Sequence, residues 1–321
     1  MLSPRPGEPV AAIVGPTAVG KSEIALEVAA RLQAEIISVD SMQVYIGMDI
    51  GTAKLPPEKR VSRDGTPIPH HLLDLVTPDQ PFSVSQYQAL ARQAILDIRK
   101  RGKLPLLVGG TGLYFQAVID PYRFQTRDES LRRRLEAEAA DYGPEHLWNK
   151  LKDLDPRAAQ RIHPHDRRRL IRALEVYFLS GQPISATWHG RYQSPYRLAL
   201  AGLTMERPVL YRRIEKRVES MLKTGLVEEV RRLLEKYGPG ATSMQALGYK
   251  EIAAYLRGEL TLDAAVELLK RNTRRFAKRQ LTWFKRDPRI RWWEIKEYQP
   301  VEEISAEIAG WISRTIDISV E

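Results

Sequence analysis

The 321-residue chain contains no cysteine, and this absence removes several classes of chemistry at once. It excludes disulfides, thiolate nucleophiles and zinc sites with cysteine ligands, but it leaves an oxygen-ligated Mg²⁺ open. Long apolar runs are also missing, so no segment could span a bilayer, and the N-terminus has no apolar signal segment. We therefore expect a cytoplasmic protein that makes no use of a membrane.

Histidine is scarce, and the excess of basic charge is unevenly distributed. Of six histidines, the only adjacent pair is His70 and His71, which follow the proline-containing segment 67–69 and are expected in a loop. The net charge is +10; up to residue 120 there are 12 basic and 12 acidic residues, and beyond it 38 basic against 28 acidic. A charge excess confined to one part of the chain favours a polyanionic partner, with nucleic acid the leading candidate.

One glycine-rich segment lies between an apolar run, residues 10–14, and a helical pattern, residues 23–32. In a strand, turn and helix of this kind, backbone N–H groups point into one concavity at the positive end of the helix. Lys21 adds a mobile cation, and the Ser22 hydroxyl could hold Mg²⁺. A plain turn would have no use for these two residues there, so the pattern predicts a diphosphate or triphosphate site. The segment reads Gly15, Pro16, Thr17, Ala18, Val19, Gly20, Lys21 and Ser22.

Short apolar runs alternate with helical patterns along most of the chain, which predicts an α/β fold. We expect a P-loop NTPase-like parallel sheet flanked by helices. Between residues 122 and 195 short helical segments follow one another without a strand pattern. Residues 1–121 and 196–321 are therefore expected to form the P-loop catalytic core, and residues 122–195 an all-helical, basic insertion domain whose charge favours binding of a nucleic acid. The expected strands are residues 10–14, 35–39, 104–108, 197–203 and 292–294.

Two polar residues follow strands of the predicted sheet. Asp40 comes directly after residues 35–39, and Thr111 lies in a second glycine-rich turn after residues 104–108. Ligands of open α/β sheets gather beyond the carboxyl ends of the strands, so both residues should lie near the phosphate loop. Asp40 is a candidate catalytic carboxylate, although it could instead hold Mg²⁺ as in an NTPase. Thr111 could place a hydroxyl in the same cleft or serve as a helix N-cap.

Basic residues after residue 120 recur at helical spacing. Arg168, Arg169 and Arg172 would share one helix face, as would Arg213 and Arg217. A solvated face is the plain alternative for the first group, but the charge excess favours binding of a phosphate backbone. The segment 245–250 combines an amide, a glycine, an aromatic ring and a cation, which suits a base or a nucleic-acid backbone.

Seven sequence blocks, in chain order, resemble the tRNA dimethylallyltransferase family. The resemblance implies transfer of a dimethylallyl group from dimethylallyl diphosphate to the exocyclic N6 amine of the adenine on the 3′ side of the tRNA anticodon. Eukaryotic members often carry a Cys/His zinc finger, so a chain without cysteine resembles the bacterial form. We expect a monomer. The blocks are residues 15–22, 37–45, 47–54, 107–114, 172–176, 247–250 and 278–283.

The same resemblance implies roles for individual residues. The phosphate loop would take the diphosphate of the prenyl donor instead of ATP, with Mg²⁺ near Ser22. Asp40 would accept the proton of the amine, with Thr111 hydrogen-bonding nearby. Arg213 and Arg217 are further candidates for the diphosphate. The implied tRNA contacts are Asp40, Ser41, Met42, Gln43, Thr111, Arg132, Arg168, Arg169, Leu170, Ile171, Arg172, Gln245, Ala246, Leu247, Gly248, Tyr249, Lys250, Lys278, Arg279 and Gln280.

Three other functions stay open at this point. An adenylate isopentenyltransferase would share the donor chemistry, but it would have little use for a basic insertion. A P-loop small-molecule kinase would explain the phosphate loop and Asp40 and leave the basic residues without a role. A non-catalytic RNA-binding ATPase would explain the loop and the charge, but not the transfer chemistry that the resemblance implies.

Overall fold

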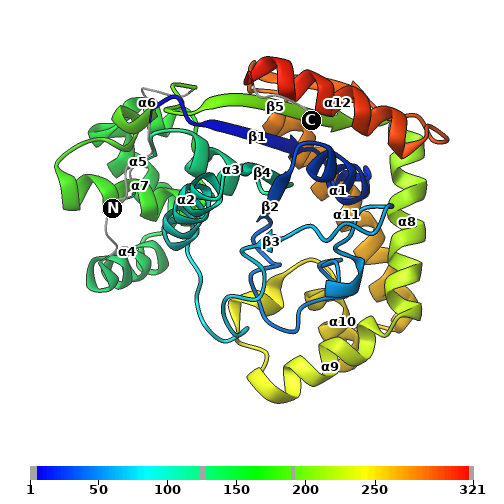
Figure 1. Cartoon of the computed structure of the whole chain (residues 1–321). Coiled ribbons are helices and arrows are strands. Elements are labelled where there is room, and N and C mark those ends of the chain that lie inside the picture. Colours follow the sequence, from blue (N-terminus) through cyan, green and yellow to red (C-terminus); the bar gives the residue numbers. More distant parts are fainter. Residues whose placement is uncertain (1–5, 123, 125–127, 189–191, 318–321) are drawn as a thin grey trace. The chain divides into compact units, whose positions relative to one another are not determined.

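The computed structural model describes residues 6–122, 124, 128–188 and 192–317. The chain divides into two compact units (Figure 1). The first consists of Met1–Ile119 with Ser194–Glu321, and the second is Asp120–Gln193. Within the described residues, no helix combines the length and the apolar character that a membrane crossing requires.

The first unit is organised around a parallel sheet whose six described strands have the order β3-β2-β4-β1-β5-β6. This confirms the predicted fold class, and five strands coincide with the predicted apolar runs. The expectation of a loop at His70 and His71 is wrong, because these residues pair with Ile36 and Ile37 at the sheet edge. Two residues are too few to show a strand period. The strands are β1 (Pro9–Val14), β2 (Ala34–Val39), β3 (His70–His71), β4 (Leu104–Gly109), β5 (Arg197–Thr204) and β6 (Ile290–Glu294).

Helices cover both faces of this sheet (Figure 1). Along β1, Ala11 and Ile13 pack towards α1 (Lys21–Arg31), α8 (Arg207–Lys223) and α12 (Val301–Thr315). The alternate side chains, including Ala12, pack with α2 (Val84–Lys100) and α3 (Gly112–Ile119) on the other face. Both faces are therefore buried, which explains why the parallel strands are apolar throughout instead of alternating.

A second layer of helices encloses the loop that follows β2. Val44, Tyr45 and Met48 of this loop are buried in an apolar cluster with side chains of α8 and of three further helices. The loop has no helix or strand of its own over residues 41–56, so this packing fixes its course. The three helices are α9 (Leu226–Tyr237), α10 (Tyr249–Leu256) and α11 (Leu262–Phe284).

The second unit has an apolar core of its own, and its described residues form helices without a strand. Leu131, Leu147, Leu151 and Leu174 are among the residues that fill this core. Aspartates at the N-caps of three helices accept backbone hydrogen bonds, as the preference of Asp for this position leads one to expect. The helices are α4 (Glu129–Asp141), α5 (Pro144–Leu154), α6 (Pro156–Ala159) and α7 (Arg167–Ser180).

Candidate functional site

The phosphate loop connects β1 to α1 and is shaped by two glycines. Gly15 has a φ of 153°, and a Cβ there would lie 2.6 Å from the carbonyl oxygen of Leu203. Gly20 has a φ of 101° and forms the N-cap of α1. Both positions require a conformation or a close approach that a side chain would strain. Val19 is fully buried and anchors the loop in the core, so the loop presents its backbone at the positive end of α1.

Three cationic side chains gather at this loop. Lys21 donates from Nζ to the carbonyl oxygens of Gly15 (3.0 Å) and Pro16 (2.7 Å). Arg217 of α8 donates from Nη1 to Thr17 Oγ1 at 3.5 Å, and Arg213, one turn earlier, places Nη2 beside Gly20. Burial, and to a lesser extent the nearby Arg217, lowers the pKa of Lys21 to about 7, although Asp40 acts in the opposite direction. An anionic ligand would stabilise the charged forms of these side chains.

Asp40 lies directly after β2, with its carboxylate partly used by the backbone. Its Oδ1 accepts hydrogen bonds from the N–H groups of Met42 (2.8 Å) and Gln43 (3.4 Å), as in an Asx turn. Thr111 Oγ1 accepts the N–H of Ser41 at 3.1 Å and ties this turn to the turn after β4. Within the described residues, no protein group bonds Oδ2 of Asp40. That oxygen is the one available to a substrate.

Gln280 of helix α11 connects the phosphate loop to the second glycine-rich turn. Gln280 accepts the N–H of Thr17 on Oε1 (2.8 Å) and donates from Nε2 to the carbonyl oxygen of Gly110 (3.0 Å). It therefore bridges the phosphate loop and the turn that carries Thr111. Glycine is required in this turn because α11 approaches so closely: a Cβ at Gly112 would lie 2.2 Å from Trp283 Cδ1.

Replacing Gly112 by alanine should therefore destabilise the fold. We expect Gly112→Ala to lower the free energy of unfolding by about 1–3 kcal/mol, because α11 must shift to admit the methyl group. Gly240→Ala is the matched control, since a Cβ there meets nothing within 4 Å. Urea denaturation of both variants measures the difference. Equal midpoints for the two variants would contradict the close approach.

Two cavities open on these residues. The first, the loop cavity, has a volume of about 380 Å³ and is lined by the phosphate loop, Arg213, Arg217 and an apolar group that includes Ile36 and Val108. The second, the turn cavity, has about 300 Å³ and is lined by Thr111, Arg279 and most of the segment 245–250. Both cavities are lined by Thr17, Asp40, Thr52, Arg217 and Phe276.

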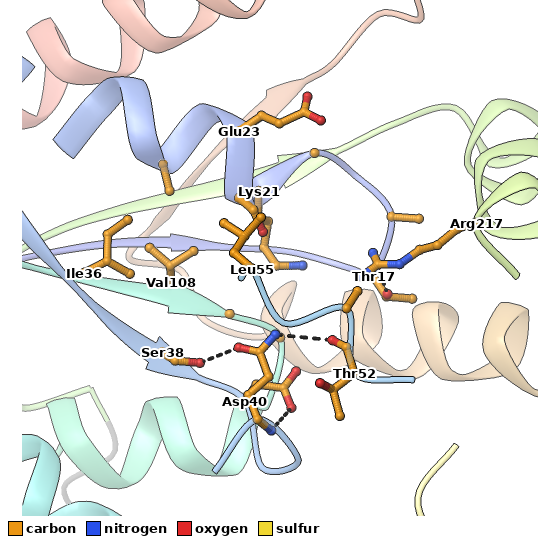
Figure 2. A pocket seen from close by; sticks show the side chains of 18 of the residues that line it. Thr17, Lys21, Glu23, Ile36, Ser38, Asp40, Thr52, Leu55, Val108 and Arg217 are labelled. Carbon is orange, nitrogen blue, oxygen red and sulfur yellow. Dashed lines mark hydrogen bonds between the residues drawn. The ribbon is translucent and has the colours of Figure 1, made fainter. Parts of the chain in front are cut away.

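The two cavities therefore adjoin at Asp40. Figure 2 shows Lys21, Thr17 and Arg217 on one side of the loop cavity and Asp40 with Thr52 on the other. A ligand with its anionic end at the phosphate loop would reach with its other end towards Asp40. A second ligand in the turn cavity would meet it there. This arrangement suits a transfer between two bound molecules.

In the first unit, some of the residues assigned to tRNA have buried or engaged side chains, or lie outside both cavities. The interpretation of Tyr249 as an RNA-contacting ring is not supported, because its side chain is fully buried and its hydroxyl donates to Glu229 Oε1 at 2.6 Å. Ala246 is largely buried but still lines the turn cavity, and the side-chain amide of Gln280 is hydrogen-bonded at both its oxygen and its nitrogen. Lys278 is exposed and lines neither cavity. Of the residues assigned to tRNA, those that line the turn cavity are Asp40, Ser41, Met42, Thr111, Gln245, Ala246, Leu247, Gly248, Lys250 and Arg279.

In the second unit, the predicted stripe on α7 is only partly exposed. Leu170 and Ile171 belong to the apolar core, so their side chains cannot contact RNA. Arg172 donates to the fully buried Glu175 at 2.7 Å, which gives it a structural partner. Arg168 and Arg169 are exposed, and they remain the candidates for RNA contact on this helix. Arg132 is half-buried and pairs with Glu136 at 3.0 Å.

Sequence reasoning gave no site role to several residues that line the two cavities, among them Ser38, Thr52, His70 and Phe276. Ser38 donates to Gln43 Oε1 at 2.8 Å, and Gln43 Nε2 donates to the carbonyl oxygen of Thr52 at 3.2 Å (Figure 2). Thr52 belongs to a block that resembles the family. Its position in the site could not be predicted, because a loop has no periodic pattern from which to infer where a side chain lies. Phe276 lies among basic residues of α11, and His70 lies in a segment interpreted as a loop. No local pattern marked either of them.

The chain is similar to proteins of known activity along nearly its whole length. The IPP transferase family model matches residues 43–287, and the Isopentenyl transferase family model matches residues 8–62. A tRNA dimethylallyltransferase of Moorella thermoacetica is 64% identical over 318 residues, which cover 98% of each chain. The solved tRNA isopentenylpyrophosphate transferase of Bacillus halodurans has a TM-score of 0.70 at 46% identity and covers 97% of this chain and 98% of that chain. A solved eukaryotic dimethylallyltransferase acting on tRNA has a TM-score of 0.83 at 27% identity, covering 98% and 81%.

Proposed function

Because the chain belongs to the IPP transferase family of tRNA dimethylallyltransferases, we propose that it transfers a dimethylallyl group from dimethylallyl diphosphate to tRNA. The acceptor is the N6 amine of the adenine on the 3′ side of the anticodon. The observation that carries the proposal is the pair of adjoining cavities. One is built around a phosphate loop, the other is lined by both polar and apolar side chains, and Asp40 lies where they adjoin.

The loop cavity suits the prenyl donor at both of its ends. The diphosphate would accept hydrogen bonds from the backbone of the phosphate loop and from Lys21, Arg213 and Arg217. The apolar side chains of Ile36, Val108 and their neighbours offer a surface to the isoprenoid chain. As the allylic C–O bond breaks, negative charge builds on the diphosphate. Cations already placed there stabilise that charge in the transition state.

The residues present also fit a magnesium ion. Ser22, Glu23 and Asp40 contribute hard oxygen atoms to the wall of the loop cavity, and the described residues contain no group of three histidines and carboxylates that could hold a metal alone. We therefore propose that Ser22 holds Mg²⁺ together with diphosphate oxygens and water. When bound, the ion would neutralise part of the diphosphate charge.

The turn cavity is the proposed site of the adenine. A base within the anticodon loop must leave its stack to react, which costs a few kcal/mol. Its amine is a weak nucleophile, because the lone pair is delocalised into the ring. Asp40 Oδ2 would accept a proton from this nitrogen as the C–N bond forms and the diphosphate leaves. Thr111, which accepts the N–H of Ser41, would hold the turn that carries Asp40.

A transfer assay tests this function. The chain is incubated with radiolabelled dimethylallyl diphosphate, Mg²⁺ and unmodified tRNA, with AMP as the competing acceptor. We expect label on the tRNA. Label on AMP alone would indicate an adenylate isopentenyltransferase, and ATP turnover without transfer would indicate a kinase or an ATPase. That the chain acts as a monomer, and in the cytoplasm, stays a prediction.

Binding of tRNA by the second unit has its own test. Replacing Arg168 and Arg169 together by alanine should weaken tRNA binding and reduce the slope of log affinity against log salt by roughly one unit for each phosphate that an arginine no longer neutralises. Arg314→Ala, an exposed arginine on α12, is the control and should leave the slope unchanged. Filter binding over a salt series measures both. If the slope of log affinity against log salt is unchanged in the double variant, Arg168 and Arg169 belong to an ordinary solvated surface and do not bind tRNA.

A further inference from the structure

Glu229 is a buried carboxylate outside both cavities. It holds the loop of residues 49–52, in which Thr52 lines both cavities. Glu229 of α9 is 5% exposed. Its Oε2 accepts the backbone N–H groups of Asp49 (3.1 Å) and Ile50 (2.8 Å), and its Oε1 accepts that of Gly51 (3.1 Å). Three successive N–H groups thus converge on one side chain from a helix 180 residues away. A carboxylate in such a nest of amides fixes the backbone around it.

Tyr249 of α10 holds the same loop from another direction. Its hydroxyl donates to Glu229 Oε1 at 2.6 Å, and its ring lies against Gly51 so closely that a Cβ there would be 2.4 Å from Tyr249 Cε2. Burial and the Glu229 carboxylate both raise the pKa of Tyr249 well above its usual value, so the phenol remains a donor. Residue 51 is therefore held between a ring and a carboxylate.

The held loop leads to the junction of the cavities. Gly51 and Thr52 line the turn cavity, and Thr52 also lines the loop cavity. The Thr52 carbonyl oxygen accepts Gln43 Nε2 at 3.2 Å, and the N–H of Gln43 donates to Asp40 Oδ1 at 3.4 Å. A continuous series of contacts thus connects Glu229 to the turn of Asp40 without Glu229 reaching either cavity.

We propose that Glu229 is a positioning residue for the transfer reaction, and that it acts by holding residues 49–52 at the junction where donor and acceptor meet. The proposal rests on the function proposed above, because it assigns Asp40 and Thr52 to the reacting end of the substrates. A displacement of about 1 Å at such a point can lower a rate ~10²-fold. Since the contacts with the remainder of the tRNA are unchanged, the effect belongs to kcat and not to the KM for tRNA.

The test uses Glu229→Gln, which keeps the size of the side chain and removes its charge. We expect kcat to fall at least about tenfold, with the KM for tRNA changed less than about twofold. Backbone hydrogen exchange at residues 49–51 should accelerate, a readout that does not depend on activity. Glu35→Gln is the matched control: Glu35 is also buried, but it lies at the start of β2 and binds Arg101 and His71. It should change neither kcat nor this exchange.

Tyr249→Phe serves as a second variant if Glu229→Gln does not fold, because it removes one donor and keeps the ring against Gly51. It should lower kcat by a smaller factor than Glu229→Gln. If exchange at residues 49–51 accelerates and kcat stays unchanged, the positioning role is overturned and the transfer function stands. If the unaltered chain transfers no label to tRNA, the proposed function fails and the positioning role fails with it.

Discussion

Replacing Asp40 by asparagine should lower turnover by ~10²- to 10⁴-fold, the range that general-base assistance contributes, while the affinity for tRNA stays within about twofold. Asparagine keeps an oxygen that can accept the N–H groups of Met42 and Gln43, so the Asx turn should persist. What it loses is the second carboxylate oxygen, which no described protein group bonds. Single-turnover transfer of label to tRNA measures the loss, because it separates the chemical step from product release.

A magnesium titration separates the two roles open to Asp40. If Asp40 accepts the proton, Asp40→Asn lowers the rate at every Mg²⁺ concentration and leaves the half-saturating concentration unchanged. If Asp40 holds the metal, the half-saturating concentration rises and excess Mg²⁺ restores activity. Asp97→Asn is the control for loss of one carboxylate, because Asp97 has a partly exposed side chain on α2 and lines neither cavity. Full activity of Asp40→Asn would remove Asp40 from the mechanism.

The sequence was informative about this site where the chemistry depends on local spacing. The order of strand, glycine-rich turn and helix is a local pattern, and it placed the phosphate loop between β1 and α1. Asp40 and Thr111 followed from the rule that strand ends of a parallel sheet share one edge, and the bond from Ser41 N to Thr111 Oγ1 joins their two turns. Such inferences need only the residue order and the fold class.

Other parts of the site depend on tertiary contacts that leave no local pattern. Tyr249 and Lys250 are adjacent in a motif rich in functional residue types, yet one is buried and the other exposed. Which of them faces a cavity depends on how α10 packs against Gly51 and Glu229, residues that are remote in the chain. Leu170 and Ile171 were assigned to tRNA because the resemblance implies contacts along the whole segment 168–172. The 3.6-residue period of α7 turns them into the core instead.

Lys21 should make binding of the prenyl donor depend on pH in the neutral range. Because burial lowers its pKa to about 7, the free protein loses the ammonium charge as the pH rises through that value. A diphosphate favours the charged form, so binding above about pH 7 requires uptake of a proton. We therefore expect the KM for the donor to rise above about pH 7, by up to tenfold per pH unit. Below about pH 7 the Lys21 ammonium is already charged, so Lys21 should cause no further change in the KM for the donor.

Two variants isolate the contribution of Lys21. Lys21→Met should lower kcat/KM for the donor by ~10²- to 10³-fold, because a preplaced cation at the leaving diphosphate is removed, and the increase in KM above about pH 7 should disappear. Lys21→Arg keeps a charge that does not titrate and should also remove the increase, while any pH dependence of the diphosphate itself remains. Steady-state kinetics between about pH 6 and 9 on the three proteins provide the comparison. An identical pH profile in all three would mean that Lys21 keeps its charge in the free protein.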